Sequence, residues 1–135
     1  RGDLWATVQW AWSIKMQGGA FTNGQRDAMR STLERADFLA QDPAIESPFI
    51  AFIKGQLHHL LGEHDPALVH LERAFLDGAF RRKYVMSLFH ALAAELIRAG
   101  RLQDAQRYAQ MAGEGKDRSE YFLQLLEAQK MNRPF

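Results

Sequence analysis

Residues that break helices interrupt this sequence at short and fairly even intervals. They stand at Gly18-Gly19, Asp42-Pro43, Gly62, Asp77-Gly78, Gly100 and Gly113. Between these breaks, apolar residues recur every three or four positions, which is the period of an amphipathic helix. No segment sustains the alternation of polar and apolar residues that a half-buried strand needs. The sequence therefore predicts an all-α chain of about seven helices joined by short connections.

Several residues indicate where the helices start. Ser47 and Asp65 each precede a proline, and a capping side chain before a proline is typical of a helix start. Asp3 is a candidate cap for the first helix, whereas Asn23-Gly24 is expected to belong to a loop because this dipeptide favours turns. The expected helix pairs cover about 3–41, 47–78 and 82–112, and a C-terminal helix covers about 117–131.

The composition is that of an ordinary globular protein. The chain has 135 residues, of which 47% are hydrophobic and 24% are charged, so 1–135 is expected to form a single domain. The 17 basic and 16 acidic residues nearly balance, which argues against a nucleic-acid partner. There is no cysteine and no apolar stretch of about 20 residues, so disulfides, thiolate metal sites and a membrane span within this chain are excluded. We expect a cytoplasmic protein, tethered to a membrane only if a region outside this chain provides an anchor.

Two stretches of the sequence are copies of each other. The segment 61–67 aligns with 99–105, so that Gly62 and Gly100 occupy the same place, 38 residues apart. Before the turn Gly55 matches Ala93, and after it Leu71 matches Ala109. The small residues Gly55, Ala67, Ala93 and Ala105 indicate a close approach of two helices, and a glycine in the turn indicates a left-handed backbone conformation.

In this arrangement the chain resembles the tetratricopeptide repeat family. Helix pairs of that family carry aromatic and Leu-Gly-like positions on the first helix and alanines on the second. The second copy follows this pattern with Phe89, Leu92, Ala93, Leu96, Ala105, Ala109 and Ala112, and the first with Ala51, Lys54, Gly55, His58, Ala67, Leu71 and Ala74. The resemblance implies antiparallel helix pairs stacked as a right-handed superhelix, with a capping helix at its C-terminal end.

The resemblance also has departures. The copies are further apart than the family period of about 34 residues, and the extra length is expected in a loop at 78–83. The first helix pair follows the pattern only through Met29, Leu33 and Ala36. The repeat-packing residues that the resemblance implies are Gly55, Ala67, Leu71, Ala74, Leu92, Ala93, Ala105, Ala109 and Ala112.

The family lines a concave groove with the first helices of successive pairs. By resemblance, the groove candidates are Phe49, Phe52, Ile53, Gln56, His59, Leu60, His90, Ala94, Ile97 and Arg98. Such a groove is suited to a peptide or a helix of another protein, and Arg98 could hold a carboxylate of that partner. Two alternatives stay open: the apolar candidates form core between repeats, and Arg98 is a solvated charge at a helix C-terminus.

Two groups of side chains have further interpretations. His58, His59, His64 and His70 lack the spacing of a metal site, so packing and surface roles are expected and no metal or other cofactor is implied. Trp5 and Trp12 share a helix face with Val8 and Met16. We expect two of the three tryptophans to pack against the second helix, with the third partly exposed.

These observations predict a protein-binding scaffold or adaptor and not an enzyme. The resemblance suggests a bacterial assembly, secretion or polysaccharide-export complex as its setting. One alternative is a self-associating homo-oligomeric module whose seam is the last helix with Leu125, Leu126 and Phe135. A more remote alternative is a hydrolase or metal enzyme with helical-repeat architecture, which would need a convergent polar pocket.

Overall fold

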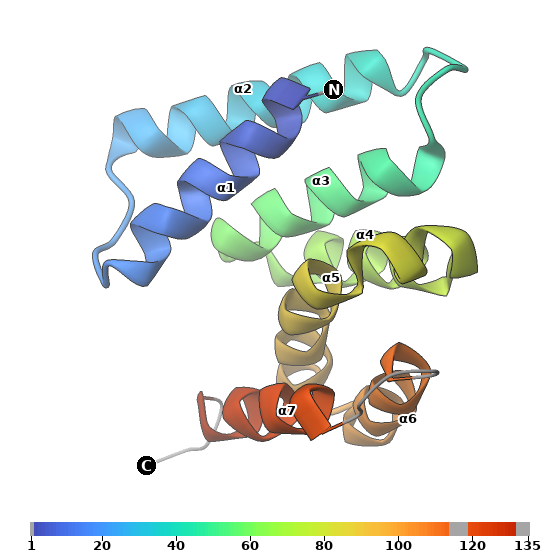
Figure 1. The fold of residues 1–135 in the computed structure, drawn as a ribbon. Coiled ribbons are helices and arrows are strands. Elements are labelled where there is room, and N and C mark those ends of the chain that lie inside the picture. The colour runs from blue at the N-terminus through green and yellow to red at the C-terminus, as the bar shows by residue number, and fades with distance from the viewer. Residues whose placement is uncertain (1, 114–118, 132–135) are drawn as a thin grey trace. The chain divides into compact units, whose positions relative to one another are not determined.

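The computed structural model describes residues 2–113 and 119–131, and all regular secondary structure in this part is helical (Figure 1). The helices are α1 (Gly2–Met16), α2 (Asn23–Leu39), α3 (Ser47–Leu60), α4 (His64–Leu76), α5 (Gly78–Arg98), α6 (Leu102–Ala112) and α7 (Ser119–Met131). The expected all-α class with about seven helices is confirmed. The bounds of α6 are those that the sequence predicts.

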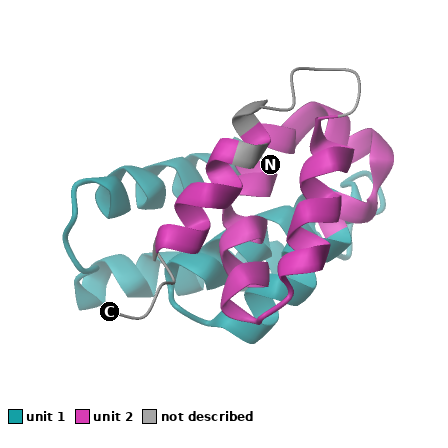
Figure 2. Cartoon of the chain, turned by 90° about the horizontal axis from the view of Figure 1, so that it is seen from below, with its two compact units in different colours: residues 1–73 teal, residues 74–135 magenta. Residues whose placement is uncertain are grey.

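The chain forms two compact units, residues 1–73 and 74–135 (Figure 2). In the first unit α1, α2 and α3 all contact one another, and in the second α5, α6 and α7 do the same. In Figure 1, α2 runs antiparallel to both α1 and α3. The boundary between the units falls within α4, near its C-terminal end, and not in a turn.

A reciprocal cap starts α2 earlier than expected. The Thr22 hydroxyl accepts a hydrogen bond from Gln25 N at 3.1 Å, and Gln25 Oε1 accepts one from Thr22 N at 2.8 Å. This pair satisfies two backbone donors at the helix start. The expectation that Asn23-Gly24 belongs to a loop is wrong, because the cap places both residues in the first turn of α2. Smaller shifts occur at α1, where Asp3 lies inside the first turn, and at α4, which begins at His64.

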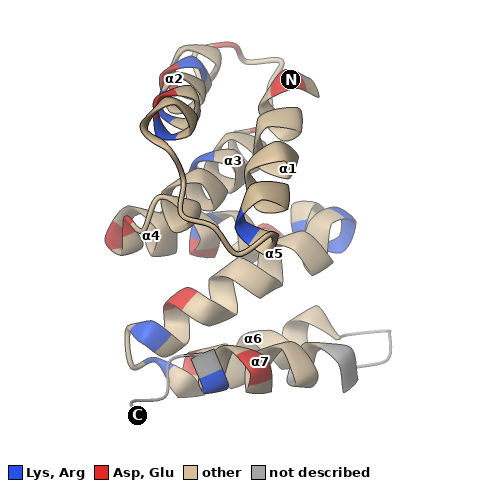
Figure 3. Cartoon of the chain, turned by 90° about the vertical axis from the view of Figure 1, so that its left-hand side faces the viewer, with Lys and Arg blue, Asp and Glu red and all other residues tan. Residues whose placement is uncertain are grey.

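The inward face of α1 differs from the expected one. Leu4, Val8 and Ala11 are buried, whereas Met16, which was expected to share the face of Val8, is 83% exposed. Trp5 and Trp12 lie half-buried beside the inward face. Between Asp3 and Lys15 the helix has no charged residue, as Figure 3 shows. The sequence therefore has no charged side in this helix from which the buried side could be predicted.

The two copied turns have the same backbone hydrogen bonding. Gly62 and Gly100 both have φ +78°, the left-handed conformation expected of them. Gly62 N donates to His59 O, and the next residue, Glu63 N, donates to His58 O. In the second copy, the amides of 100 and 101 bond in the same way to the carbonyls of 97 and 96. Both turns are therefore Schellman motifs, so the duplication extends to the backbone.

The close approach expected at Gly55 is present. A Cβ atom on Gly55 would lie 2.6 Å from Leu71 Cγ and 3.0 Å from Leu71 N, so α3 and α4 come too close there for a side chain. All of the implied repeat-packing residues are buried; besides Gly55 these are Ala67, Leu71, Ala74, Leu92, Ala93, Ala105, Ala109 and Ala112.

The segment 78–83 is helical and not the expected loop. Asp77 Oδ1 accepts a hydrogen bond from Phe80 N at 2.9 Å, which caps α5 at Gly78. Arg81 Nη1 donates to Phe75 O at 2.7 Å. The helix then kinks at Tyr84 (φ −123°, ψ 20°), whose ring stacks on Phe80. The residues in excess of the family period therefore form an added helical turn before a kink.

Aromatic side chains form much of the core of unit 2. The Phe75 ring lies 5.0 Å from that of Tyr108, and the Phe89 ring meets Tyr121 edge-on at 5.7 Å between centroids. The first contact joins the end of α4 to α6, and the second joins α5 to α7. On α7 Leu125 is buried and Leu126 is 53% exposed. The expected start of this helix near Asp117 lies outside the described residues.

Candidate functional site

Five of the six groove candidates on α3 lie in the core of unit 1. These five are at most 6% exposed; they are Phe49, Phe52, Ile53, Gln56 and Leu60. Helix α1 lies against this part of α3. The Trp5 ring stacks on Phe52 at 5.3 Å, and Trp12 Nε1 donates to Gln56 Oε1 at 2.9 Å. These five residues therefore form core, as the alternative interpretation expected. Of the α3 candidates only His59 retains a substantial exposed surface.

The tryptophans partly follow the expectation. Trp10 is 40% exposed, and the other two pack inward, as expected. Their ring contacts and the Trp12 hydrogen bond are with α3, whereas the expectation named the second helix. The half-buried His59 lies beside Trp12, with 5.6 Å between the ring centroids. The indole rings thus cover the side of α3 that was expected to line a groove.

The α5 candidates remain at the surface. His90 and Arg98 are exposed, and Ala94 and Ile97 are half-buried. Met86, which is 41% exposed, precedes His90 by one helical turn and was missed in the sequence. Spacings of three and four residues place Met86, His90, Ala94 and Ile97 on one side of the helix, next to Arg98 in its last turn. We call these five residues the α5 face.

Two of the histidines expected to have packing or surface roles, His58 and His70, contact each other in unit 1. His58 Nδ1 lies 3.0 Å from Glu63 Oε1, and the His58 ring stacks on His70 with 5.9 Å between centroids. Arg30 Nη2 donates to Glu63 Oε2 at 3.0 Å, and this hydrogen bond is the main cause that lowers the pKa of Glu63. Among the residues that the structure describes, no three His, Asp or Glu side chains converge as a metal site.

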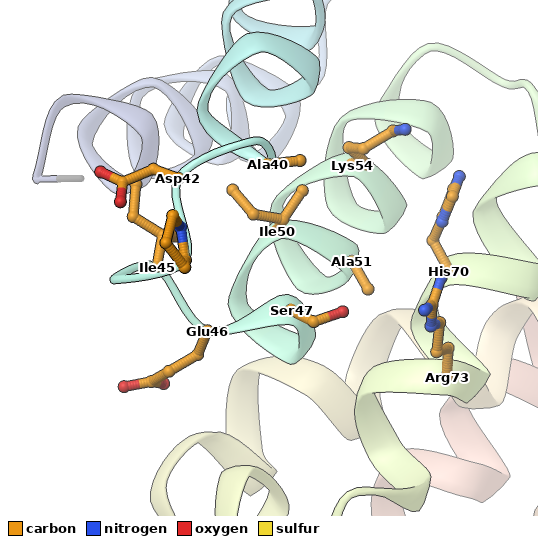
Figure 4. Close-up of a pocket in the computed structure, with 11 residues that line it drawn as sticks. Ala40, Asp42, Ile45, Glu46, Ser47, Ile50, Ala51, Lys54, His70 and Arg73 are labelled. Carbon is orange, nitrogen blue, oxygen red and sulfur yellow. The ribbon is translucent and has the colours of Figure 1, made fainter.

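A hollow of about 540 Å³ opens in unit 1 between the start of α3, the loop that precedes it and α4 (Figure 4). We call it the α3–α4 hollow. Its apolar lining comes from Ala40, Pro43, Ile45, Ile50 and Ala51, and its polar lining from Asp42, Glu46, Ser47, Lys54, His70 and Arg73.

The electrostatics of the hollow are set by a few side chains. Lys54 Nζ is paired with Asp37 Oδ1 at 2.6 Å. Burial lowers the pKa of His70, and the positive charges of Lys54, His58 and Arg73 lower it further. His70 is therefore neutral near pH 7 and can donate one hydrogen bond and accept another.

The sequence did not predict that these side chains line one hollow. Lys54 and His58 were assigned to repeat positions of the first copy, and His70 was considered only as a candidate metal ligand. The available signal was their spacing: Lys54 and His58 are one turn apart on α3, and His70 and Arg73 are one turn apart on α4. The sequence does not show that these two pairs face each other, because that depends on the close approach at Gly55.

None of the helices in the described part of the chain has the length and apolar character that crossing a bilayer requires. In comparisons with known proteins, no family model, no curated protein and no solved structure matches the chain.

Proposed function

We propose that this chain is a tetratricopeptide-like repeat domain, stacked as an α-solenoid, that binds a segment of another protein and has no catalytic activity of its own. The observation that supports this best is the structural duplication. The turns at Gly62 and Gly100 share their hydrogen bonding, and small buried residues flank both. Folds of repeated helix pairs offer extended surfaces to partner chains. The bacterial and cytoplasmic setting rests on the resemblance alone.

The α5 face is the part of the expected groove best suited to such a partner. Met86 and Ile97 supply apolar contact area along one side of a long helix. Arg98 at the end of that side can form paired hydrogen bonds with a carboxylate. These features fit a helix or an extended segment that has apolar residues followed by an acidic residue.

The test uses site-specific photo-crosslinking and a charge reversal. A photoreactive residue at Ile97 should crosslink a partner from the native organism, whereas one at the exposed Gln110 on α6 should not. With that partner purified, Arg98→Glu should weaken binding about tenfold or more, because the lost interaction is a charge-assisted hydrogen bond. Arg82→Glu, at the other end of α5, is the matched control and should bind like the parent. Equal crosslinking from both positions, or parental affinity of Arg98→Glu, would show that the α5 face is not the binding surface.

A second candidate function, self-association through α7, is favoured by a different observation. Leu123 and Leu126 are 59% and 53% exposed on this helix. Leu125, expected in the seam, is buried, and Phe135 lies outside the described residues. If α7 is a seam, light scattering should report a dimer that Leu126→Glu dissociates. A parent chain that stays monomeric as its concentration rises rules this function out.

A further inference from the structure

We propose that the α3–α4 hollow binds a small organic anion with an apolar body, such as a medium-chain carboxylate. This site is separate from the α5 face, and the inference does not depend on the proposed function. It rests on three observations, namely polar side chains without partners, an apolar wall beside them, and an unmatched positive charge on the side of the hollow formed by α4.

The first observation concerns hydrogen-bonding groups that face the hollow. The side chains of Ser47 and Arg73 form no hydrogen bond or ion pair with the residues that the structure describes, and the His70 ring nitrogens form no hydrogen bond with them. Figure 4 shows the Ser47 hydroxyl pointing from α3 toward the side where His70 and Arg73 lie on α4. Three hydrogen-bonding side chains therefore remain available around one space. A carboxylate has two oxygens that could accept from all three.

The second observation is the apolar wall. Ile50 and Ala51 line the hollow and are themselves only 6% and 4% exposed, so this wall is firmly packed from behind. Ala40, Pro43 and Ile45 extend the wall into the preceding loop. The volume of about 540 Å³ lies within the usual range of small-molecule sites. A ligand that is only an ion would leave this wall in water, whereas an alkyl chain would cover it.

The third observation is the balance of charge. The positive charge of Lys54 is matched by Asp37, so Arg73 supplies the unmatched positive charge. Of the two acidic residues in the lining, Glu46 points away from His70 and Arg73 in Figure 4. Asp42 Oδ1 already accepts a hydrogen bond from Ala44 N at 2.9 Å. The side of the hollow formed by α4 therefore favours an anion over a cation.

Protonation of His70 would add a second positive charge to the site. Its pKa lies below the ordinary value of 6.5, first because of burial and then because Lys54, His58 and Arg73 are nearby, while Asp37 acts in the opposite direction. An anion prefers the protonated ring, so its affinity should rise as the pH falls below 6.5. The acidic side chains of the lining, Asp42 and Glu46, belong to the loop before α3.

The experiment is a nuclear magnetic resonance titration of the whole chain with three probes. Hexanoate should shift the amide signals of Ser47, Ala51, His70 and Arg73 at millimolar concentrations. Hexanol, which has no charge, and acetate, which has no apolar body, should shift them at least about tenfold more weakly, the factor expected for a lost charge-assisted contact. Hexyl phosphate as a fourth probe distinguishes a site for carboxylates from one that accepts any anionic head group.

Variants assign the effect to the hollow. Arg73→Gln should weaken hexanoate binding about tenfold, whereas Arg82→Gln, which lies outside the hollow, should leave it unchanged. His70→Gln should remove the strengthening at low pH and leave the weaker binding at pH 7.5. Both replaced side chains retain surface exposure, and an unchanged amide spectrum away from the hollow verifies that each variant folds.

The proposal is overturned if hexanoate and hexanol shift the same signals equally, or if hexanoate shifts none of them. It is also overturned if Arg73→Gln binds hexanoate like the parent. None of these results concerns the α5 face. A hollow that does not bind hexanoate would therefore leave the proposed binding of a partner protein unaffected.

Discussion

At Gly55, α3 has no room for a side chain. The Cβ atom of an alanine would lie 2.6 Å from Leu71 Cγ and 3.0 Å from the Leu71 backbone nitrogen, and Leu71 is fully buried. We expect Gly55→Ala to lower the free energy of unfolding by about 1 kcal/mol or more, because the overpacking exceeds the gain in helix propensity. Gly24→Ala is the control, since nothing lies within 4 Å of its Cβ position in the first turn of α2. Urea unfolding should show no loss for this control, and a Gly55→Ala variant as stable as the parent would contradict the observed approach.

Glu63 gives unit 1 a pH-dependent contribution to stability. Its pKa lies below the ordinary value of 4.5, mainly because Arg30 donates a hydrogen bond to it. A lowered pKa means that the stabilisation is present above pH 4.5 and is lost as the pH falls through the value in the folded state. Glu63→Gln should therefore lower the free energy of unfolding at pH 7 by about 0.2–1 kcal/mol, the range of partly exposed pairs.

The difference between Glu63→Gln and the parent should shrink as the pH is lowered below 4.5, because the parent carboxylate becomes protonated as the pH falls through its pKa in the folded state. Thermal melts of both proteins across this range are the measurement. In an Arg30→Gln background the effect of Glu63→Gln should be smaller. A difference that does not change with pH would show that the charge of Glu63 plays no part.

At the scale of single helices, α1 is held to α3 by its tryptophans. Trp12 Nε1 donates to Gln56 Oε1, and Gln56 is fully buried. Trp12→Phe keeps an aromatic ring but removes this donor, so it should lower the free energy of unfolding by about 1 kcal/mol or more. Trp10→Phe, at a position that is 40% exposed, should change it by less than about 0.5 kcal/mol. Chemical unfolding of both variants would show equal effects if α1 did not dock through Trp12.

The accuracy of the sequence-based helix bounds depended on how unambiguous the end signals were. Gly62, Gly100 and the limits of α6 followed directly from breakers and periodicity. Asn23-Gly24 was misread as a loop. Asp77-Gly78 does end α4, but it was not recognised as the start of α5, because the same residue types favour turns and cap helices. Only the hydrogen bonds of Thr22 with Gln25, and of Asp77 with Phe80, separate the two cases. The kink at Tyr84 has no signal in the sequence, since no proline or glycine stands there.

At the scale of the whole molecule, the same repeat position can be compared in both units. Ala67 and Ala105 align in the two copies and are both fully buried. Leucine at either position should overpack the core and lower the free energy of unfolding by about 1–3 kcal/mol. Ala28→Leu on the exposed side of α2 should have little effect. Thermal melts of the three variants are the measurement. If Ala105→Leu leaves the stability unchanged while Ala67→Leu lowers it, the repeat alignment holds in unit 1 but not in unit 2.

The binding surfaces were harder to predict than the repeat. Helical periodicity identifies which residues share a side of a helix, but not which neighbour covers that side. Phe52 and Gln56 fitted the groove pattern as well as Ile97 did, yet α1 buries the first two. The α3–α4 hollow depends on facing pairs of side chains from two helices and on a loop. Such placement comes from tertiary packing, which a single sequence does not reveal.

The docking of α1 has a consequence for synthesis on the ribosome. The partner of Trp12 lies 44 residues further along the chain, and that of Trp5 lies on the same later helix. While the chain grows from its N-terminal end, α1 emerges long before α3 exists to cover it. For that interval a segment with three tryptophans and no charge between Asp3 and Lys15 stays exposed to solvent. Nascent chains of this protein should therefore engage a general chaperone early in translation and be released once α3 has left the exit tunnel.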